Sequence, residues 1–312
     1  GFLQRVFAGD LDSPVGTTTY GQMLNERGGI ECDLTVTRLG GAAFLLVVPA
    51  ATVQRDLAWL RRNLGADVAV ILDVTAAEAV FPLMGPRSRE VMQAISPDDF
   101  SNAAFPFGAA REIELGMGVV RAHRISYVGE LGWEIYASTD QAAHVFETLL
   151  DAGEGFGLRL AGLHAMDSCR IEKAFRHFGH DITDEDHVLE AGLGFAVKTG
   201  AKKAFLGRDA VLRKREEGLK RRLVQFMLAE PEPVLFHNEP LVRDGEIVGI
   251  VTSANYGHAL GGAIGMGYVP CEGESAEEVL ASGYEIEIAG SRVRAAASLA
   301  PMYDPKAARV RT

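Results

Sequence analysis

Hydrophobic positions in the first third of the chain follow strand and helix spacings in turn. Residues 17–24 and 30–39 are strand-like and flank a turn at 25–29, a combination typical of a β-hairpin. Further along, Val53, Leu57 and Leu60 recur at the spacing of one helix face. The predicted elements here are strands at 17–24, 30–39, 43–48 and 68–74, the last of them buried, and helices at 52–64 and 87–95. The pattern predicts a mixed α/β fold.

The middle third repeats the α/β pattern. Strands are predicted at 114–126 and 133–137. A helix then opens on Ser138 or Thr139, with Thr139 as the expected N-cap, and runs towards Gly153. Two further helices are predicted, at 162–175 and 187–197, on either side of an acidic loop at 181–186.

The last third, from Phe205 on, changes to strands after one short helix. Asp244-Gly245 and Ala289-Gly290 are typical of tight hairpin turns. The predicted strands lie at 220–228, 241–256, 264–270, 285–288 and 293–298. Consecutive strands joined by such turns predict a β-barrel or a β-sandwich.

Length and composition indicate a multidomain globular protein. A chain of 312 residues exceeds the usual size of one hydrophobic core, so two or three domains are expected. The net charge of -11 disfavours a nucleic-acid partner, which would need a cationic surface. The apolar stretches at 42–53 and 68–83 are interrupted and shorter than the ~20 residues of a membrane span, so no membrane segment is expected.

Cysteine usage and missing motifs narrow the function further. The three cysteines fit neither a disulfide framework nor a zinc knuckle, which favours a reducing, cytoplasmic location. A G-x-S-x-G elbow, a Walker loop and a G-x-G-x-x-G fingerprint are all absent from the sequence. We therefore expect this chain alone to bind neither NAD nor FAD.

Three segments carry candidate chemistry, and the first is the hairpin around Asp33. Alternation places Ile30, Cys32, Leu34 and Val36 on one face and Glu31, Asp33, Thr35 and Thr37 on the other. Asp33 either lies on a solvated face or lines a pocket, where it would attract a cationic amine or relay a proton.

The second segment, residues 126–135, is a glycine-flanked loop that enters a strand. It combines the carboxylates Glu130 and Glu134 with the aromatic residues Tyr127 and Trp133. A carboxylate can accept two parallel hydrogen bonds from the edge of an amino-pyrimidinone while aromatic walls exclude water. The alternative is a tight turn with an ordinary ion pair.

The third segment, residues 167–181, places Asp167, Arg170 and Lys173 along one side of a helix. Such a row either guides an anionic substrate tail or forms a solvated helix face. His177, His180 and Asp181 suggest a metal at first sight, but a further ligand and helical register are missing. We expect no metal site.

In this order along the chain, the segments resemble the aminomethyltransferase family, the glycine cleavage T-protein and its relatives. The family patterns G-G-[IV]-x-x-D-[LIV]-x-V, Y-x-G-E-x-G-x-E-I, D-[ST]-x-R-[LI]-E, F-[IL]-G-[RK] and G-x-[VI]-T-S match residues 28–36, 127–135, 167–172, 205–208 and 249–253. The runs at 172–178, 255–258 and 303–311 resemble the folate domains of sarcosine and dimethylglycine dehydrogenases. The likeness covers essentially the entire chain.

The resemblance implies an α+β fold, a three-domain clover-leaf of two α/β domains and a C-terminal β-barrel. The expected domains are 1–95 with the catalytic hairpin, 96–203 with the pterin-binding loop, and 204–312 with the barrel. Family members begin with a further segment of the first domain, so we expect the chain to be truncated at its N-terminus and to lack a flavin domain.

By motif position, the resemblance implies that Asp33 is catalytic and that Glu134, Tyr127, Arg170 and, as the weaker candidate, Glu130 bind tetrahydrofolate. The implied reaction captures an iminium or formaldehyde-level unit as 5,10-methylene-tetrahydrofolate. Its partners would be an N-methyl amine or aminomethyl donor and a flavin oxidoreductase domain or subunit, which would hold the FAD. The alternatives are a stand-alone aminomethyltransferase or folate-dependent demethylase, and a non-catalytic folate-binding or assembly module.

Overall fold

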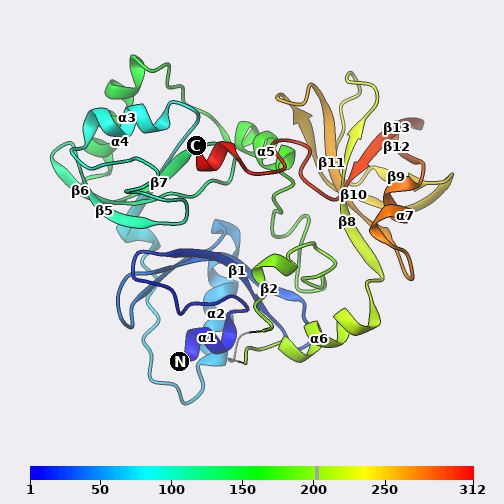
Figure 1. Cartoon of the computed structure of the whole chain (residues 1–312), viewed down its shortest axis with the longest axis horizontal. Coiled ribbons are helices and arrows are strands. Elements are labelled where there is room, and N and C mark those ends of the chain that lie inside the picture. Colours follow the sequence, from blue (N-terminus) through cyan, green and yellow to red (C-terminus); the bar gives the residue numbers. More distant parts are fainter. Residues whose placement is uncertain (201–203) are drawn as a thin grey trace.

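The computed structural model describes residues 1–200 and 204–312, which form three lobes around a common centre (Figure 1). Each lobe contains one sheet: β1-β2-β3, β4-β7-β6-β5, and a closed barrel of order β10-β11-β8-β13-β12-β9. The predicted α+β fold with a C-terminal barrel is confirmed.

The first lobe holds the predicted hairpin. Its elements are α1 (Phe2–Val6), β1 (Thr18–Leu24), β2 (Ile30–Arg38), β3 (Phe44–Val47) and α2 (Val53–Leu64). The inward face of β2 contributes Cys32, Leu34 and Val36 to a core that also contains Trp59 of α2. The period of two along β2 is therefore real, and it leaves Asp33 and Thr35 on the opposite face.

The buried strand predicted at 68–74 is wrong. Residues 67–74 have no strand structure, and Val68, Val70 and Leu72 are 105%, 84% and 74% exposed. Within the part of the chain that the structure describes, no strand pairs with this segment, and only Ile71 packs against the core of the first lobe. An apolar run specifies a strand only when a neighbouring strand takes up its backbone hydrogen bonds.

The second lobe is a four-stranded antiparallel sheet with two helices. Its elements are β4 (Glu78–Met84), α3 (Ser88–Ile95), β5 (Ala110–Leu115), β6 (Gly118–His123), β7 (Gly132–Ser138) and α4 (Ala142–Glu154). β4 pairs with β7, and Val91 and Met92 of α3 lie in the core of this sheet. The predicted domain boundary at residue 95 remains a prediction. It assigns β4 and α3 to the first domain, whereas both elements pack in the second lobe.

Two predictions in this lobe need correction. The single strand at 114–126 is a hairpin, β5 and β6, because Gly116 turns the chain with φ of +60°. α4 begins at Ala142, and the hydroxyl of Thr139 donates to the carbonyl of Ala76 at 2.8 Å instead of capping the helix.

Between the second lobe and the barrel lie α5 (Leu163–Glu172), the 3-10 turn η3 (Gly194–Ala196) and α6 (Arg208–Glu217). The helix predicted at 187–197 is wrong. Gly192 has φ of +72°, which a right-handed helix cannot contain, and the chain forms turns there instead. Apolar side chains of 182–211 pack against Leu24 and Ile30 at the tip of the hairpin.

The barrel confirms the predicted hairpin turns. Its strands are β8 (Arg221–Leu228), β9 (Pro240–Arg243), β10 (Glu246–Gly257), β11 (Gly262–Pro270), β12 (Tyr284–Ile288) and β13 (Ser291–Ser298), with α7 (Ala276–Ala281) before β12. Both residues of Asp244-Gly245 and of Ala289-Gly290 have positive φ, as type I′ turns require. The turn at 244–245 divides the strand that we predicted at 241–256.

The C-terminal segment leaves the barrel and crosses to the second lobe (Figure 1). Arg89 and the buried Arg124 donate to the carbonyl of Thr312 at 2.6 and 3.0 Å. Together with Lys173, which donates to the carbonyl of Asp304 at 2.6 Å, these bonds fasten the barrel to its neighbour.

Candidate active site

Asp33 lies on the polar face of the β1-β2 hairpin, where two side chains of β1 hold it. The register pairs Gln22 with Asp33, Tyr20 with Thr35 and Thr18 with Thr37. Asp33 Oδ1 accepts hydrogen bonds from the Tyr20 hydroxyl at 2.7 Å and from Gln22 Nε2 at 2.9 Å. Among the described residues, Oδ2 has no donor, so one carboxylate oxygen is held and the other is available to a ligand.

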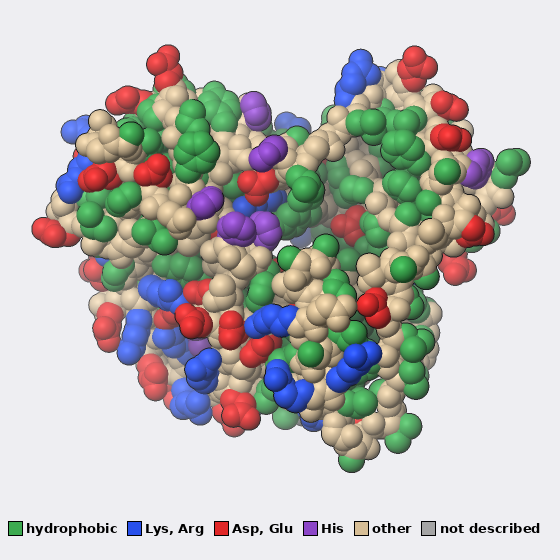
Figure 2. All heavy atoms as spheres, turned by 180° about the vertical axis from the view of Figure 1, so that it is seen from behind, with side chains coloured by type: hydrophobic (Ala, Val, Ile, Leu, Met, Phe, Trp, Pro, Cys, Tyr) green, Lys and Arg blue, Asp and Glu red, His purple; other side chains and the backbone are tan. Residues whose placement is uncertain are grey.

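The surroundings of Asp33 form a concave wall. Burial raises the pKa of Asp33 to about 6, against the lowering effects of Gln22, Tyr20 and Arg176. Tyr20 keeps 37% of its surface accessible, yet the surrounding protein raises the pKa of its hydroxyl well above the ordinary value. Water reaches the Tyr20 side chain although protein surrounds it. Tyr20 therefore lies in a recess. Figure 2 shows a hollow between lobes on one face of the molecule.

Glu134 lies on β7, directly opposite His123 of β6. Its Oε2 accepts a hydrogen bond from the Tyr136 hydroxyl at 2.6 Å, and burial raises its pKa. The His123 ring packs on Tyr136 with centroids 4.3 Å apart. Burial lowers the pKa of His123 to about 3, so the imidazole is neutral at physiological pH.

A row of polar residues runs along β2 from Asp33 to Thr37, which meets His123, the residue opposite Glu134. His123 Nδ1 lies 3.4 Å from the hydroxyl of Thr37, on the same hairpin face as Asp33. From Asp33 to Thr37 the strand rises about 13 Å, since each residue adds ~3.3 Å. Glu134 therefore stands beyond one end of the row and Asp33 at the other, and Thr37 and His123 between them are fully buried.

Buried polar atoms without partners occur at both ends of this row. Gln22 Oε1, beside Asp33, and His123 Nε2, beside Glu134, have no hydrogen-bond partner among the described residues. Glu134 Oε1 likewise has no protein donor there, so the carboxylate can accept from a ligand. Unpaired buried groups are costly, and such atoms also occur away from this row, at Trp133 Nε1 for example.

Tyr127 belongs to the wall of the recess. Its hydroxyl donates to the carbonyl of Arg176 at 2.9 Å, and its ring stacks on Phe175 with centroids 6.0 Å apart. Asp33 is one of the charges that raise the pKa of Tyr127, after burial and the charge of Asp181. Its polar atom is thus engaged by the backbone, and its ring remains as an aromatic surface.

Arg170 is placed differently from our expectation. The predicted row along the helix does not form, because α5 ends at Glu172 and Lys173 turns to the C-terminal segment. Arg170 is 2% exposed. Its guanidinium donates to Asp167 at 2.7 Å, Asp181 at 2.7 Å, the carbonyl of Phe175 at 3.0 Å and Ser253 Oγ at 2.9 Å. With four protein acceptors, it joins α5, the following loop and the barrel, and its role as a folate ligand stays a prediction that this geometry does not favour.

Glu130 and the histidine segment also have structural partners. Glu130 accepts a hydrogen bond from the Tyr303 hydroxyl and pairs with Arg309 at 3.5 Å, so it holds the C-terminal segment. Asp181 is occupied by Arg170 and by the Thr252 hydroxyl. In the described part of the chain, no group of three histidine, cysteine, aspartate or glutamate residues is arranged to hold a metal ion.

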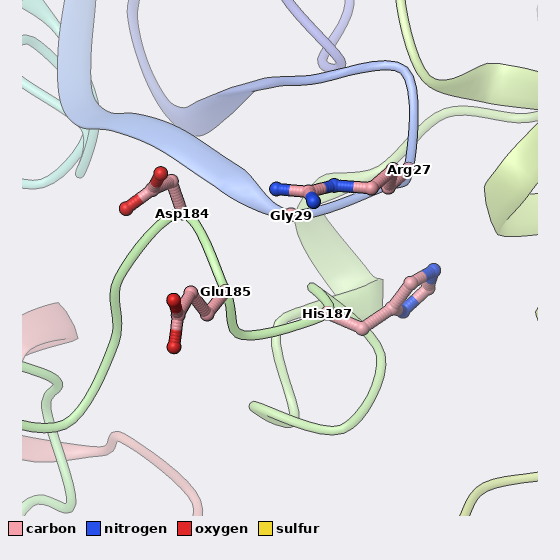
Figure 3. Close-up of a pocket in the computed structure, with 5 residues that line it drawn as sticks. All are labelled: Arg27, Gly29, Asp184, Glu185 and His187. Carbon is pink, nitrogen blue, oxygen red and sulfur yellow. The ribbon is translucent and has the colours of Figure 1, made fainter.

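Two clefts lie elsewhere, and none of the predicted site residues lines them. One, of about 340 Å³, is bordered by the hairpin tip and the loop at 184–187, as Figure 3 shows. The other, of about 670 Å³, lies along β10 and β11 beside α6 and contains the ion pairs of Arg221 with Asp186 and Glu190. Within the described residues, no helix has the length and apolarity to cross a membrane.

Four residues around Asp33 and Glu134 were not singled out from the sequence: Tyr20, Gln22, His123 and Arg176. Tyr20 and Gln22 could have been found, because they alternate along the strand predicted at 17–24 and face the side chains of the paired strand. His123 gave no local signal, because Thr37, which it meets, belongs to the first lobe. Arg176 lies in the run at 172–178, but its place near Asp33 depends on the tertiary structure.

Comparison with known proteins agrees with this architecture. Residues 1–201 match the family described as the GCVT N-terminal domain, and residues 221–304 match the glycine cleavage T-protein C-terminal barrel domain. The chain therefore belongs to the glycine cleavage T-protein family of aminomethyltransferase-like proteins, as the motifs predicted.

Individual relatives include an oxidase, a dehydrogenase and an aminomethyltransferase. The chain is 40% identical over 308 residues to 4-methylaminobutanoate oxidase (formaldehyde-forming) of Paenarthrobacter nicotinovorans, covering 99% of this chain and 37% of that protein. It is 35% identical to mitochondrial sarcosine dehydrogenase of Homo sapiens, covering 98% and 35%. The crystal structure of glycine cleavage system aminomethyltransferase T from Bartonella henselae superimposes with a TM-score of 0.84 at 28% identity, covering 97% and 81%. The chain thus spans little more than a third of the first two relatives.

Proposed function

We propose that this chain binds tetrahydrofolate in the recess and passes a one-carbon unit at the formaldehyde level to it, giving 5,10-methylene-tetrahydrofolate. The observation that carries the proposal is Asp33, with one oxygen held by Tyr20 and Gln22 and the other available, at a pKa of about 6. Membership of the aminomethyltransferase-like family supports the identity of the acceptor.

The chemistry follows from the charge changes in the reaction. An amine that forms a bond to an electrophilic carbon becomes positively charged and must release a proton. The Asp33 carboxylate stabilises that charge and accepts the proton, and a pKa near 6 leaves it mostly ionised at neutral pH. The bonds from Tyr20 and Gln22 keep the carboxylate oriented while this happens.

Glu134 is proposed to bind the heterocycle. Tyr136 occupies one of its oxygens and fixes the carboxylate, and the second can accept from an amino group of the pterin edge. Tyr127 would supply an aromatic surface at the Asp33 end of the recess.

We further propose that the chain works as the folate domain of a flavin-dependent N-methyl amine dehydrogenase similar to sarcosine or dimethylglycine dehydrogenase. The relatives with matching names support this, and the flavin would then be held by a partner domain or subunit. A stand-alone aminomethyltransferase or demethylase is the alternative. A non-catalytic folate-binding or assembly module is a third candidate, but it gives no physical reason for a buried carboxylate with an unbonded oxygen at a raised pKa.

Calorimetry with tetrahydrofolate, followed by the rate of methylene-tetrahydrofolate formation from formaldehyde, tests the proposal. The uncatalysed condensation is measured in parallel without protein. Asp33→Asn is expected to bind tetrahydrofolate nearly as well as the wild type and to lose the rate above background. Asp140→Asn, at an exposed aspartate, is the matched control. An unchanged rate in Asp33→Asn would exclude the catalytic role, and the absence of binding by the wild type would exclude the function.

A further inference from the structure

Arg176 differs from the other buried and partly buried arginines around the centre of the molecule. Arg170 pairs with Asp167 and Asp181, Arg221 with Asp186 and Glu190, and Arg55 with Glu31. Among the described residues, no carboxylate lies within ion-pair distance of Arg176. Burial lowers its pKa, whereas the carboxylates around Arg170 and Arg221 raise theirs.

The guanidinium of Arg176 is nevertheless held rigidly. Its Nε donates to the carbonyl of Ala191 at 2.9 Å and its Nη1 to the carbonyl of Ala174 at 2.6 Å. Nη2 lies against Gly192, where an added Cβ would be only 2.6 Å away, so the glycine makes room for it. Two backbone acceptors fix the plane, and Nη2 has no acceptor in the described part of the chain.

The position of Arg176 joins it to the recess around Asp33. After burial, the groups whose charges act on it are Tyr20, Asp181, Tyr268 and, most weakly of the four, Asp33. The loop that accepts its Nε continues to Phe195, which stacks on Tyr20 with centroids 6.3 Å apart, and Tyr20 in turn holds Asp33. Arg176 is thus a fixed cation with an unused Nη2, near enough to the recess for Tyr20 and Asp33 to act on its charge, and its backbone carbonyl accepts from Tyr127 of the recess wall.

We propose that Arg176 binds a carboxylate of the ligand in the recess, either the glutamate of the folate or the carboxylate of an N-methylamino acid donor. The inference rests on the proposed function and adds to it a determinant of substrate class. A guanidinium fork matches a carboxylate in geometry and charge, and in a chain of net charge -11 a local cation is needed to attract an anion. Without a ligand, its charge lacks a carboxylate partner, which is a cost that an anionic ligand removes.

Arg176→Met and Arg176→Lys test the proposal by calorimetry with four ligands in two matched pairs. Tetrahydrofolate is compared with tetrahydropteroate, which lacks the glutamate, and N-methylglycine with dimethylamine, which lacks the carboxylate. Arg176→Met is expected to weaken binding about tenfold or more for the carboxylate member of one pair only, and Arg176→Lys by less, because it keeps the charge but not the fork. The pair that responds identifies the source of the carboxylate.

Equal weakening of both members of a pair, or no weakening at all, would overturn the proposal, and urea midpoints of the variants show whether the fold is intact. If Arg176→Met does not fold, the wild type decides. In one of the two pairs, the affinity of the wild type for the carboxylate compound must then fall more steeply with salt than its affinity for the matched compound without the carboxylate. Parallel salt dependence in both pairs overturns the inference. Wild-type protein that binds no tetrahydrofolate refutes the proposed function as well, whereas binding that does not depend on Arg176 refutes only this inference.

Discussion

Replacing Asp33 by asparagine removes a buried negative charge but keeps the geometry of its side chain. The amide oxygen of the introduced asparagine can still accept from the Tyr20 hydroxyl and from Gln22 Nε2, because both bonds end on the same oxygen, Oδ1. The variant therefore isolates the free-energy cost of holding an ionised carboxylate in the recess. We expect it to be more stable than the wild type at pH 8.

The expected gain follows from the pKa of Asp33. The difference between its ordinary value of 3.8 and about 6 in the folded protein corresponds to about 3 kcal/mol. Because the folded-state pKa is raised, the folded protein binds more protons than the unfolded chain between these two values. Wild-type stability therefore falls, relative to the variant, as the pH rises from 3.8 to 6, and the difference stays constant above that window.

Urea unfolding, followed by tryptophan fluorescence, measures this difference. Trp59 lies in the core that the hairpin builds and Trp133 in the core of the second lobe, so the signal reports on both lobes, including the one that contains Asp33. The gain in the free energy of unfolding should be about half as large at pH 5 as at pH 8. The control Asp140→Asn should show no gain at either pH. A variant that is less stable than the wild type at pH 8, or a gain independent of pH, would refute the reasoning.

Three further substitutions separate binding from structure. Glu134→Gln should weaken tetrahydrofolate binding about tenfold, since a charged acceptor is lost, and an unchanged Kd in calorimetry would argue against its role. Arg170→Met should lower the free energy of unfolding by about 3 to 5 kcal/mol, because Asp181 loses the guanidinium that compensates its buried charge. Urea denaturation measures that loss, and a cost below about 1 kcal/mol would contradict a structural role. Glu130→Gln should leave tetrahydrofolate affinity unchanged but expose the segment around Tyr303 to limited proteolysis. Weaker folate binding in this variant would show that Glu130 is a folate ligand and would contradict its purely structural role.

Much of the candidate site could be anticipated because its motifs are local in sequence. Alternation along the hairpin separated Asp33 from the core face, and the strand after the 126–132 loop carried Glu134. The partners of these residues could not be anticipated in the same way. His123 and Thr37 meet across 86 residues of sequence, and neither strand alone indicates which surface its polar face will contact.

Arg170 and Arg176 show most clearly which part of the site the sequence alone does not predict. They stand six positions apart in one charged segment, and composition treats them alike. In the structure, Arg170 is surrounded by acceptors from α5, the following loop and the barrel, whereas Arg176 has only backbone acceptors and an unused edge among the described residues. Which arginine is structural and which is available depends on where Asp181 and Ser253 lie in space.

The sequence alone determined the hairpin, the barrel turns and the family. These features follow from periodicity, turn residues and the order of motifs, which depend on residues a few positions apart. Only the tertiary structure decided that residues 68–74 are exposed, that 187–197 does not form a helix, and that Glu130 holds the C-terminal segment. The reason is the same in each case. Burial, strand pairing and ion pairing are completed by groups distant in sequence, and local patterns do not contain them.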